Sequence, residues 1–268
     1  MRFYRRLIPA LCLTLLLSGC SSIPFTTPEE QQAALLETEA LRKEAEAQVD
    51  PLELQKNDLA LRRKLTTANG IALAEYLVEL PAFSTQGQKA QSFARINEYY
   101  KNELSGLNQD ADSLFAHVQS VYGPEWLSVP EPTHTFRTEV DYEILEAPAG
   151  YLCVRMDFYV QEDATVEQYS AAQVFLLDNG WKLTLETLLG EDYAAAAPRL
   201  LEAILTWCDN NGIDVADRES RTLEEFSQNY ALTREGFIFY TQPFQMSNKN
   251  ASRYRIPVSL DDYAGMLD

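Results

Sequence analysis

The sequence contains only two histidines and four cysteines among its 268 residues. A zinc site needs several histidine, cysteine or carboxylate ligands at defined spacings, and neither an HExxH segment nor paired CxxC segments occur. Nucleophilic catalysis needs a base beside the nucleophile, and neither His117 nor His134 stands in a motif of that kind. We therefore predict no metal, no cofactor, no catalytic residue and no enzymatic activity. His117 is expected to pack at a helix edge, and His134 to lie in solvent.

The chain also lacks an apolar run long enough to cross a membrane as a helix. The run Leu7–Leu17 has eleven residues, whereas a transmembrane helix needs about 20. Three arginines precede this run, and it ends in the letters LSGC, an order typical of a secretion signal. The ending resembles a bacterial lipobox, which implies that residues 1–19 are a signal peptide. Cys20 would then carry palmitate-type acyl chains and hold the protein on the cell membrane, facing outside the cytoplasm. An ordinary signal peptide is the alternative.

Basic residues are few: 22 Lys and Arg stand against 40 Asp and Glu, for a net charge of −18. Removing residues 1–19 takes away three arginines and no acidic residue, which leaves −21. Such a surface repels phosphate backbones, so a nucleic-acid partner is not expected. It attracts cationic partners, although the same excess would also serve solubility alone.

Two cysteines, Cys153 and Cys208, remain outside the signal and the lipid site. Export permits a disulfide between them. Cys208 falls on the apolar side of a predicted helix, whereas Cys153 alternates with Arg155 and Asp157 on the polar side of a predicted strand. A disulfide requires Cα atoms within about 7 Å, and the sequence leaves the pairing open.

The mature chain divides into three parts by composition. Residues 20–27 form a short tether. Residues 28–66 follow the cap Thr27, which forms a capping pattern with Pro28, Glu29 and Glu30. The pattern restarts at Asp50-Pro51, and the segment is rich in charge, which predicts a helical stalk. Residues 70–268 carry strand and helix patterns that indicate one α+β domain.

Within that domain the patterns predict an antiparallel sheet packed with helices. Helices are expected over 87–105, near 112–123, over 198–212 and near 223–230, the third one closed by Gly212. The letters DNG at 178–180 predict a two-residue type I′ hairpin turn. The expected strands are 71–80, 135–145, 151–160, 170–189, 236–240 and 254–260.

Several stretches resemble, in order, the extracellular domain of RsiV-type anti-sigma factors, a domain of unknown function numbered 3298. They are LPAF at 80–83, RINEYY at 95–100, NGWKLTL at 179–185, FYTQPF at 239–244 and IPVSL at 256–260. The resemblance covers about residues 70–268. It implies a binding or sensing module at the bacterial envelope, because in the anti-sigma factors this domain is the part that recognises lysozyme.

Two departures separate this chain from that pattern. Members of the family carry a Gly-Gly-Ala-His segment after the strand that corresponds to VRMDFYV, whereas this chain has QEDATVEQY at 161–169. The sigma-binding region and transmembrane helix of an anti-sigma factor are replaced here by the lipobox. The chain is therefore not expected to signal inward alone.

A ligand surface is predicted on one face of the strand 151–160. Alternation sends Leu152, Val154, Met156, Phe158 and Val160 to the core and leaves Tyr151, Cys153, Arg155, Asp157 and Tyr159 on the other face. Of these, Tyr151, Arg155, Asp157 and Tyr159 are residue types that anchor protein interfaces or stack on sugars. An ordinary solvent-facing sheet has the same composition.

The segment GFIFYTQPFQM at 236–246 is apolar on both strand faces, which predicts a strand covered on both sides. Pro243 should end its ladder. Phe244 and Met246 would then lie in the following loop, where Phe244 is a further candidate ligand contact.

The leading hypothesis is a lipid-anchored surface protein that binds a cationic protein such as lysozyme, or a peptidoglycan-type glycan. An accessory lipoprotein that assembles with a membrane complex through 28–66 is the alternative. A cryptic hydrolase is a third reading, since the sequence does not give the spacing of carboxylate pairs. Ligand identity and oligomeric state stay undetermined.

Overall fold

The computed structural model describes residues 59–243, 245–246 and 252–259. The predicted signal peptide, lipid site and tether, and most of the predicted stalk, lie outside the described residues. The described chain is an α+β domain, as the sequence predicts. In these ranges no helix is both long and apolar enough to traverse a membrane.

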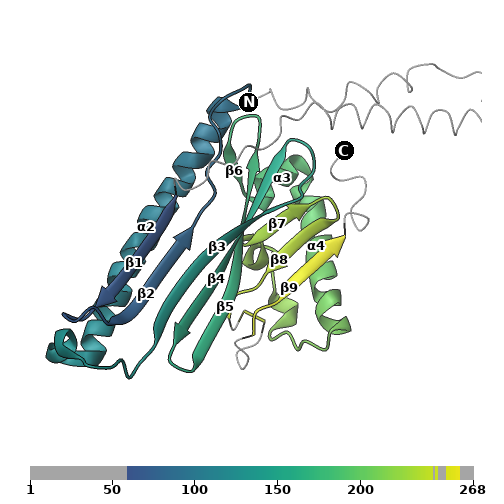
Figure 1. Cartoon of the computed structure of the whole chain (residues 1–268). Coiled ribbons are helices and arrows are strands. Elements are labelled where there is room, and N and C mark those ends of the chain that lie inside the picture. The colour runs from purple at the N-terminus through teal and green to yellow at the C-terminus, as the bar shows by residue number, and fades with distance from the viewer. Residues whose placement is uncertain (1–58, 244, 247–251, 260–268) are drawn as a thin grey trace, which may run out of the picture. The chain divides into compact units, whose positions relative to one another are not determined.

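Six of the described strands form one sheet in the order β1 to β6 (Figure 1). Their bounds are Ala60–Thr66 for β1, Ala72–Glu79 for β2, Phe136–Leu145 for β3, Tyr151–Glu162 for β4, Thr165–Leu176 for β5 and Trp181–Leu183 for β6. Neighbouring strands run antiparallel except β2 and β3, which are parallel. Parallel strands need a crossover connection, and here the helix α2 (Ala90–Tyr122) supplies it.

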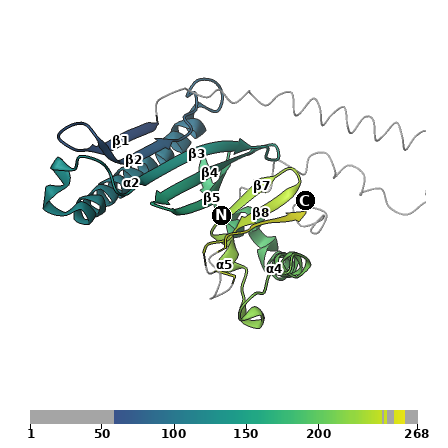
Figure 2. The ribbon, with the colours of Figure 1, turned by 60° about the horizontal axis from the view of Figure 1, so that its bottom comes forward.

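Helix α2 covers one face of this sheet (Figure 2). Phe93, Ile96 and Tyr100 recur at helical spacing and are buried against the sheet. The side-chain amide of Asn97 accepts a hydrogen bond from the Phe83 N–H at 2.9 Å and donates one to the Phe83 carbonyl at 2.8 Å. The stretches LPAF and RINEYY are therefore in direct contact, and Asn97 holds the segment that leads into α2.

A second, three-stranded sheet consists of β7 (Tyr230–Thr233), β8 (Gly236–Tyr240) and β9 (Arg255–Ser259). It packs over part of the other face of the large sheet, beside β4 and β5. The remaining helices are α3 Leu185–Leu189, α4 Tyr193–Asn210 and α5 Glu224–Ser227, with short 3₁₀ turns at Gly123–Ser128, Gly190–Asp192 and Arg218–Ser220. Helix α4 closes the second core, which every residue of β8 enters as predicted.

Asn229 joins the two sheets. Because β6 is short, its pairing with β5 ends at Val174. Beyond that point the Asn229 side chain accepts a hydrogen bond from the Ala172 N–H and donates one to the Ser170 carbonyl, each at 2.9 Å. The Asn229 backbone carbonyl accepts from the Tyr240 N–H at 3.0 Å. One buried residue therefore connects the edge of β5 to β8.

The predicted stalk is wrong at its C-terminal end, because Ala60–Thr66 is the edge strand β1. Leu61 and Leu65 stand four apart, which suits a helix, but they also alternate with charged residues, which suits a strand. The pairing with β2 decides the outcome. Arg62 bonds Glu79 across the two strands at 2.6 Å, and Lys64 pairs with Glu75.

The two helices expected over 87–105 and 112–123 are a single helix, α2. Gly106 lies inside this helix, between the two predicted ranges. A helical glycine costs about 1 kcal/mol relative to alanine. Burial of residues on both sides of Gly106, from Phe93 to Val118, offsets that cost.

The hairpin at 178–180 exists, but its turn is not type I′. A type I′ turn needs positive φ at two residues, and in this turn only Gly180 has it, with φ of 72°. A Cβ at Gly180 would lie 2.3 Å from the Ser92 carbonyl oxygen. Glycine is therefore required both by the backbone and by the close approach of α2. The strand expected to continue to 189 ends at Leu183, and Leu185–Leu189 is the helix α3, capped by Thr184.

Cys153 and Cys208 are both buried and both free. The predicted polar surroundings of Cys153 are wrong, because the three-stranded sheet covers this part of β4. Burial raises the pKa of Cys153 to about 12 and that of Cys208 to about 11. Both thiols therefore belong to the apolar core as protonated groups at neutral pH.

Candidate functional site

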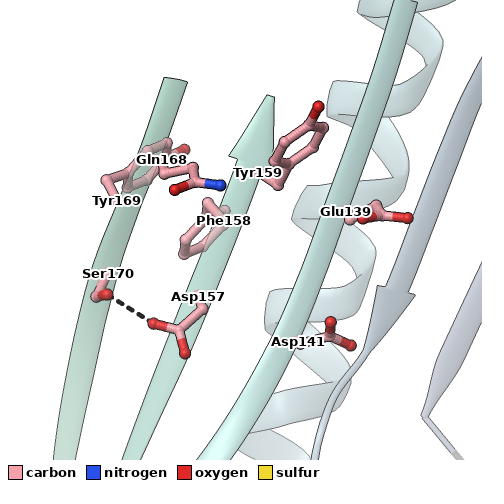
Figure 3. Close-up of a pocket in the computed structure, with 8 residues that line it drawn as sticks. All are labelled: Glu139, Asp141, Asp157, Phe158, Tyr159, Gln168, Tyr169 and Ser170. Atoms are coloured by element: carbon pink, nitrogen blue, oxygen red, sulfur yellow. Dashed lines mark hydrogen bonds between the residues drawn. The ribbon is translucent and has the colours of Figure 1, made fainter. Parts of the chain in front are cut away.

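The candidate site is an open groove on the part of the large sheet that the three-stranded sheet leaves uncovered. Strand register places two rows of side chains across β3, β4 and β5 on one face. The rows are Glu139, Tyr159 and Gln168, and Asp141, Asp157 and Ser170. They line a cavity of about 360 Å³ (Figure 3).

Asp157 is fixed by neighbours on both sides. Figure 3 shows its carboxylate turned toward β5, where the Ser170 hydroxyl donates to it at 2.6 Å. The Arg155 guanidinium donates to both Asp157 oxygens at 2.8 to 3.0 Å and reaches Glu143 at 2.7 Å. The charge of Asp157 is thus compensated within the protein.

Asp141 differs from the carboxylates around it. Glu79 pairs with Arg62, Glu139 with Arg137, and Asp157 with Arg155. Asp141 has no hydrogen-bond or ion-pair partner in the part of the chain that the structure describes.

Asp141 is exposed, but its partial removal from water raises its pKa above the ordinary value, and the charges of Glu79, Glu139 and Asp157 add to that effect. Like charges disfavour the ionised form of a carboxyl group. A cationic group placed in the groove would pair with Asp141 and remove this repulsion.

The predicted ligand residues divide between this groove and the core. Asp157 and Tyr159 line the groove, and Arg155 positions Asp157. Tyr151 instead packs against the second hydrophobic core. Phe244 lies outside the described residues, and Met246, expected in an open loop, is buried with 1% of its surface exposed.

Glu139 and Asp141 were not among the predicted site residues. They alternate with Val140 in the sequence, which indicates one strand face. That signal does not identify the neighbouring strand. Only the register of β3 with β4 places these carboxylates beside Asp157 and Tyr159.

The two histidines lie away from the groove, near the turn that joins β4 to β5. His134 is not merely solvated, since its Nδ1 lies 2.8 Å from Asp163 Oδ2. His117 Nε2 lies 3.3 Å from Glu162 Oε1, and its ring packs edge-on against Phe136. The hydrogen bond from His134 lowers the pKa of Asp163. These contacts agree with the structural role expected for His117.

No cluster of side chains suited to hold a metal ion occurs in the described ranges. In the groove, Ser170 donates to a carboxylate rather than to an imidazole base. What the groove offers is one uncompensated carboxylate, a half-buried tyrosine and a set of fixed acidic neighbours. This arrangement suits capture of a cationic side chain.

No family model matches the sequence, and no curated protein matches it. A solved structure of a DUF3298 family member from Bacteroides fragilis has a TM-score of 0.50 at 11% identity, covering 78% of this chain and 91% of that chain. A DUF3298 family protein from Pseudomonas aeruginosa has a TM-score of 0.48 at 11% identity, covering 81% and 97%. The first likeness shows that the domain has a DUF3298-like fold.

Replacing Asp141 by asparagine should stabilise the domain at pH 7. A carboxyl whose folded pKa is raised disfavours folding when ionised, so its penalty is present at neutral pH and is lost as pH falls through that pKa. The gain should lie within the ~0–1 kcal/mol of exposed charge interactions. Urea unfolding at pH 7 and about pH 4 measures it. Glu202→Gln, exposed on α4, is the matched control. Destabilisation by Asp141→Asn at pH 7 would contradict the repulsion.

Proposed function

We propose that the protein is a lipid-anchored envelope protein that binds a cationic protein ligand through the acidic groove. The observation that carries the binding proposal is Asp141, the carboxylate that lacks a cation while its three neighbours each have an arginine. A lysine or arginine from a partner would complete the set. The chain's net charge of −18 would steer such a partner toward the groove.

The resemblance to the RsiV-type extracellular domain suggests lysozyme as the first cationic ligand to test. The DUF3298-like fold is compatible with that resemblance and does not identify a ligand. Tyr159, which lines the groove beside Glu139, supplies an aromatic ring of the kind that anchors protein interfaces. Catalysis is not part of this proposal.

Membrane attachment in the proposal rests on the lipobox-like ending at Cys20. Acyl chains contribute about 0.8 kcal/mol per buried CH₂ group, so two or more chains give durable attachment. The groove would then be presented to ligands outside the cytoplasm.

Lipidation is tested by expressing the full-length protein in bacteria with radiolabelled palmitate. We expect label on the wild-type protein and recovery in the membrane fraction. Cys20→Ser should lose the label and leave that fraction, whereas Cys12→Ser, inside the predicted signal peptide, should keep both. Label that persists in Cys20→Ser would rule out this anchor.

Cationic binding is tested with the chain from residue 21 onward and lysozyme, by surface-based affinity measurement at low and high salt. The pair Glu139→Gln and Asp141→Asn should weaken binding about tenfold, because it removes charges at the contact itself. The pair Asp178→Asn and Glu202→Gln changes the net charge equally at exposed sites elsewhere and should have little effect.

Salt should weaken the wild-type complex more than the complex of the groove variant, because screening acts on the charges that the variant lacks. If both variant pairs lost affinity for lysozyme equally, net charge alone, and not the groove, would determine binding. Absence of lysozyme binding in the wild-type protein would refute lysozyme as the ligand.

A further inference from the structure

A second cavity, of about 350 Å³, opens at the edge of β5, and most of its β4 and β5 lining lies on the strand faces opposite the acidic rows. Met156, Ala171 and Gln173 belong to the strand faces that look toward α2. Tyr99 and Glu103 of α2 form one wall. The other wall consists of Glu225, Phe226, Gln228, Asn229, Tyr240, Gln242 and Gln245. Strand β6 pairs only with Val174–Leu176 of β5, and the cavity lies beside the part of β5 that precedes Val174.

The acidic and basic charges around this cavity balance one another. Lys182 Nζ donates to the Tyr99 hydroxyl at 3.1 Å, and the charge of Glu103 opposes the lowering of the Lys182 pKa by burial. The second acidic residue, Glu225, pairs with Arg221 at 2.6 Å. Lys182 and Glu103 carry opposite charges, so the lining together with Arg221 has no net charge, in contrast to the acidic groove, and it favours an uncharged ligand.

Carboxamides dominate the polar lining. Asn229 and Gln245 are engaged in the structure, Gln245 through the Gln242 N–H at 2.7 Å and the Glu225 carbonyl at 2.6 Å. The side chains of Gln228 and Gln242 make no hydrogen bond within the described residues.

Gln173 is the most informative of these amides. It is 96% buried and lines the cavity, and its Oε1 accepts from the Tyr100 hydroxyl at 3.4 Å. No described residue accepts from its Nε2. This amide group therefore faces the open space of the cavity, where a ligand or water can accept its hydrogen bond.

We infer that this cavity binds an uncharged saccharide unit. A carboxamide both donates and accepts, which matches hydroxyl groups that do the same. Tyr99, Phe158 and Met156 provide the apolar surface against which the C–H face of a sugar ring packs. The volume lies at the low end of the ~300–1,000 Å³ of small-molecule pockets.

An extended peptide is the competing ligand class, because exposed strand edges bind peptides by adding a strand. Here the edge of β5 beside the cavity is already occupied. The Asn229 side chain accepts from the Ala172 N–H and donates to the Ser170 carbonyl. Arg253 donates to the Gln168 carbonyl at 3.3 Å. The backbone groups that a peptide would need are thus engaged, which leaves side-chain recognition of a small ligand.

This inference does not rest on the cationic-partner proposal, since the acidic groove lies on the other strand face. The test is saturation-transfer NMR on the full-length protein in a phosphocholine detergent. The probes are neutral hexoses, N-acetylated hexosamines and their disaccharides. A hexuronate, an unacetylated hexosamine and a neutral tripeptide serve as comparison ligands.

We expect transfer to at least one neutral saccharide, with a dissociation constant on the order of millimolar, and weaker transfer to the charged analogues. Gln242→Ala, at the cavity rim, and Gln173→Leu should each weaken binding about five- to tenfold, as expected for one lost hydrogen bond. Gln109→Ala, exposed on α2, is the matched control and should bind as the wild type does.

Thermal unfolding of each variant shows whether the fold is intact, and Gln242→Ala keeps the test decisive if Gln173→Leu unfolds. The inference is overturned if no saccharide in the panel binds, if Gln242→Ala binds as tightly as wild type, or if the tripeptide binds in place of the sugars.

Discussion

The arrangement of the domain depends on how the edge of β5 is closed. A strand edge with unpaired N–H and C=O groups is costly when buried and prone to association when exposed. In this protein β6 pairs with only the last part of β5, and the Asn229 side chain then replaces one peptide unit of the missing strand. Because Asn229 also bonds the β8 backbone, the closure of one sheet fixes the position of the other.

Both cavities follow from this closure. The three-stranded sheet covers the end of β4 that contains Tyr151 and Cys153, and it leaves the rows around Asp141 and Asp157 open. On the opposite strand face, the segment that contains Asn229 forms a wall of the amide-lined cavity. One cavity has an uncompensated carboxylate and the other has balanced acidic and basic charges, so the two cavities suit different ligands.

Local patterns predicted much of this fold. The apolar strand 236–240, the hairpin at Gly180 and the end of α4 just before Gly212 follow from residue type and spacing, and each is present. The strand Ala60–Thr66 was missed because its leucines fit both periods, and only pairing with β2 decides between them. Long-range packing likewise made α2 continuous through Gly106.

The site was predictable only in part, for the same reason. Alternation along β4 identified Asp157 and Tyr159. The raised pKa of Asp141, in contrast, depends on carboxylates that lie on three different strands. No local pattern gives that neighbourhood. Nor does the sequence show that Cys153 lies under a second sheet, since that depends on where Asn229 binds the edge of β5.

Amide hydrogen exchange at Ala172 tests the central role of Asn229 most directly. Although β6 does not extend to Ala172, the Ala172 N–H should exchange slowly, as core amides do, because Asn229 accepts its hydrogen bond. Asn229→Ala should abolish that protection while amides in the α2 core stay protected. Exchange at Ala172 in the wild-type protein as fast as at Ala164, in the exposed turn between β4 and β5, would contradict the account.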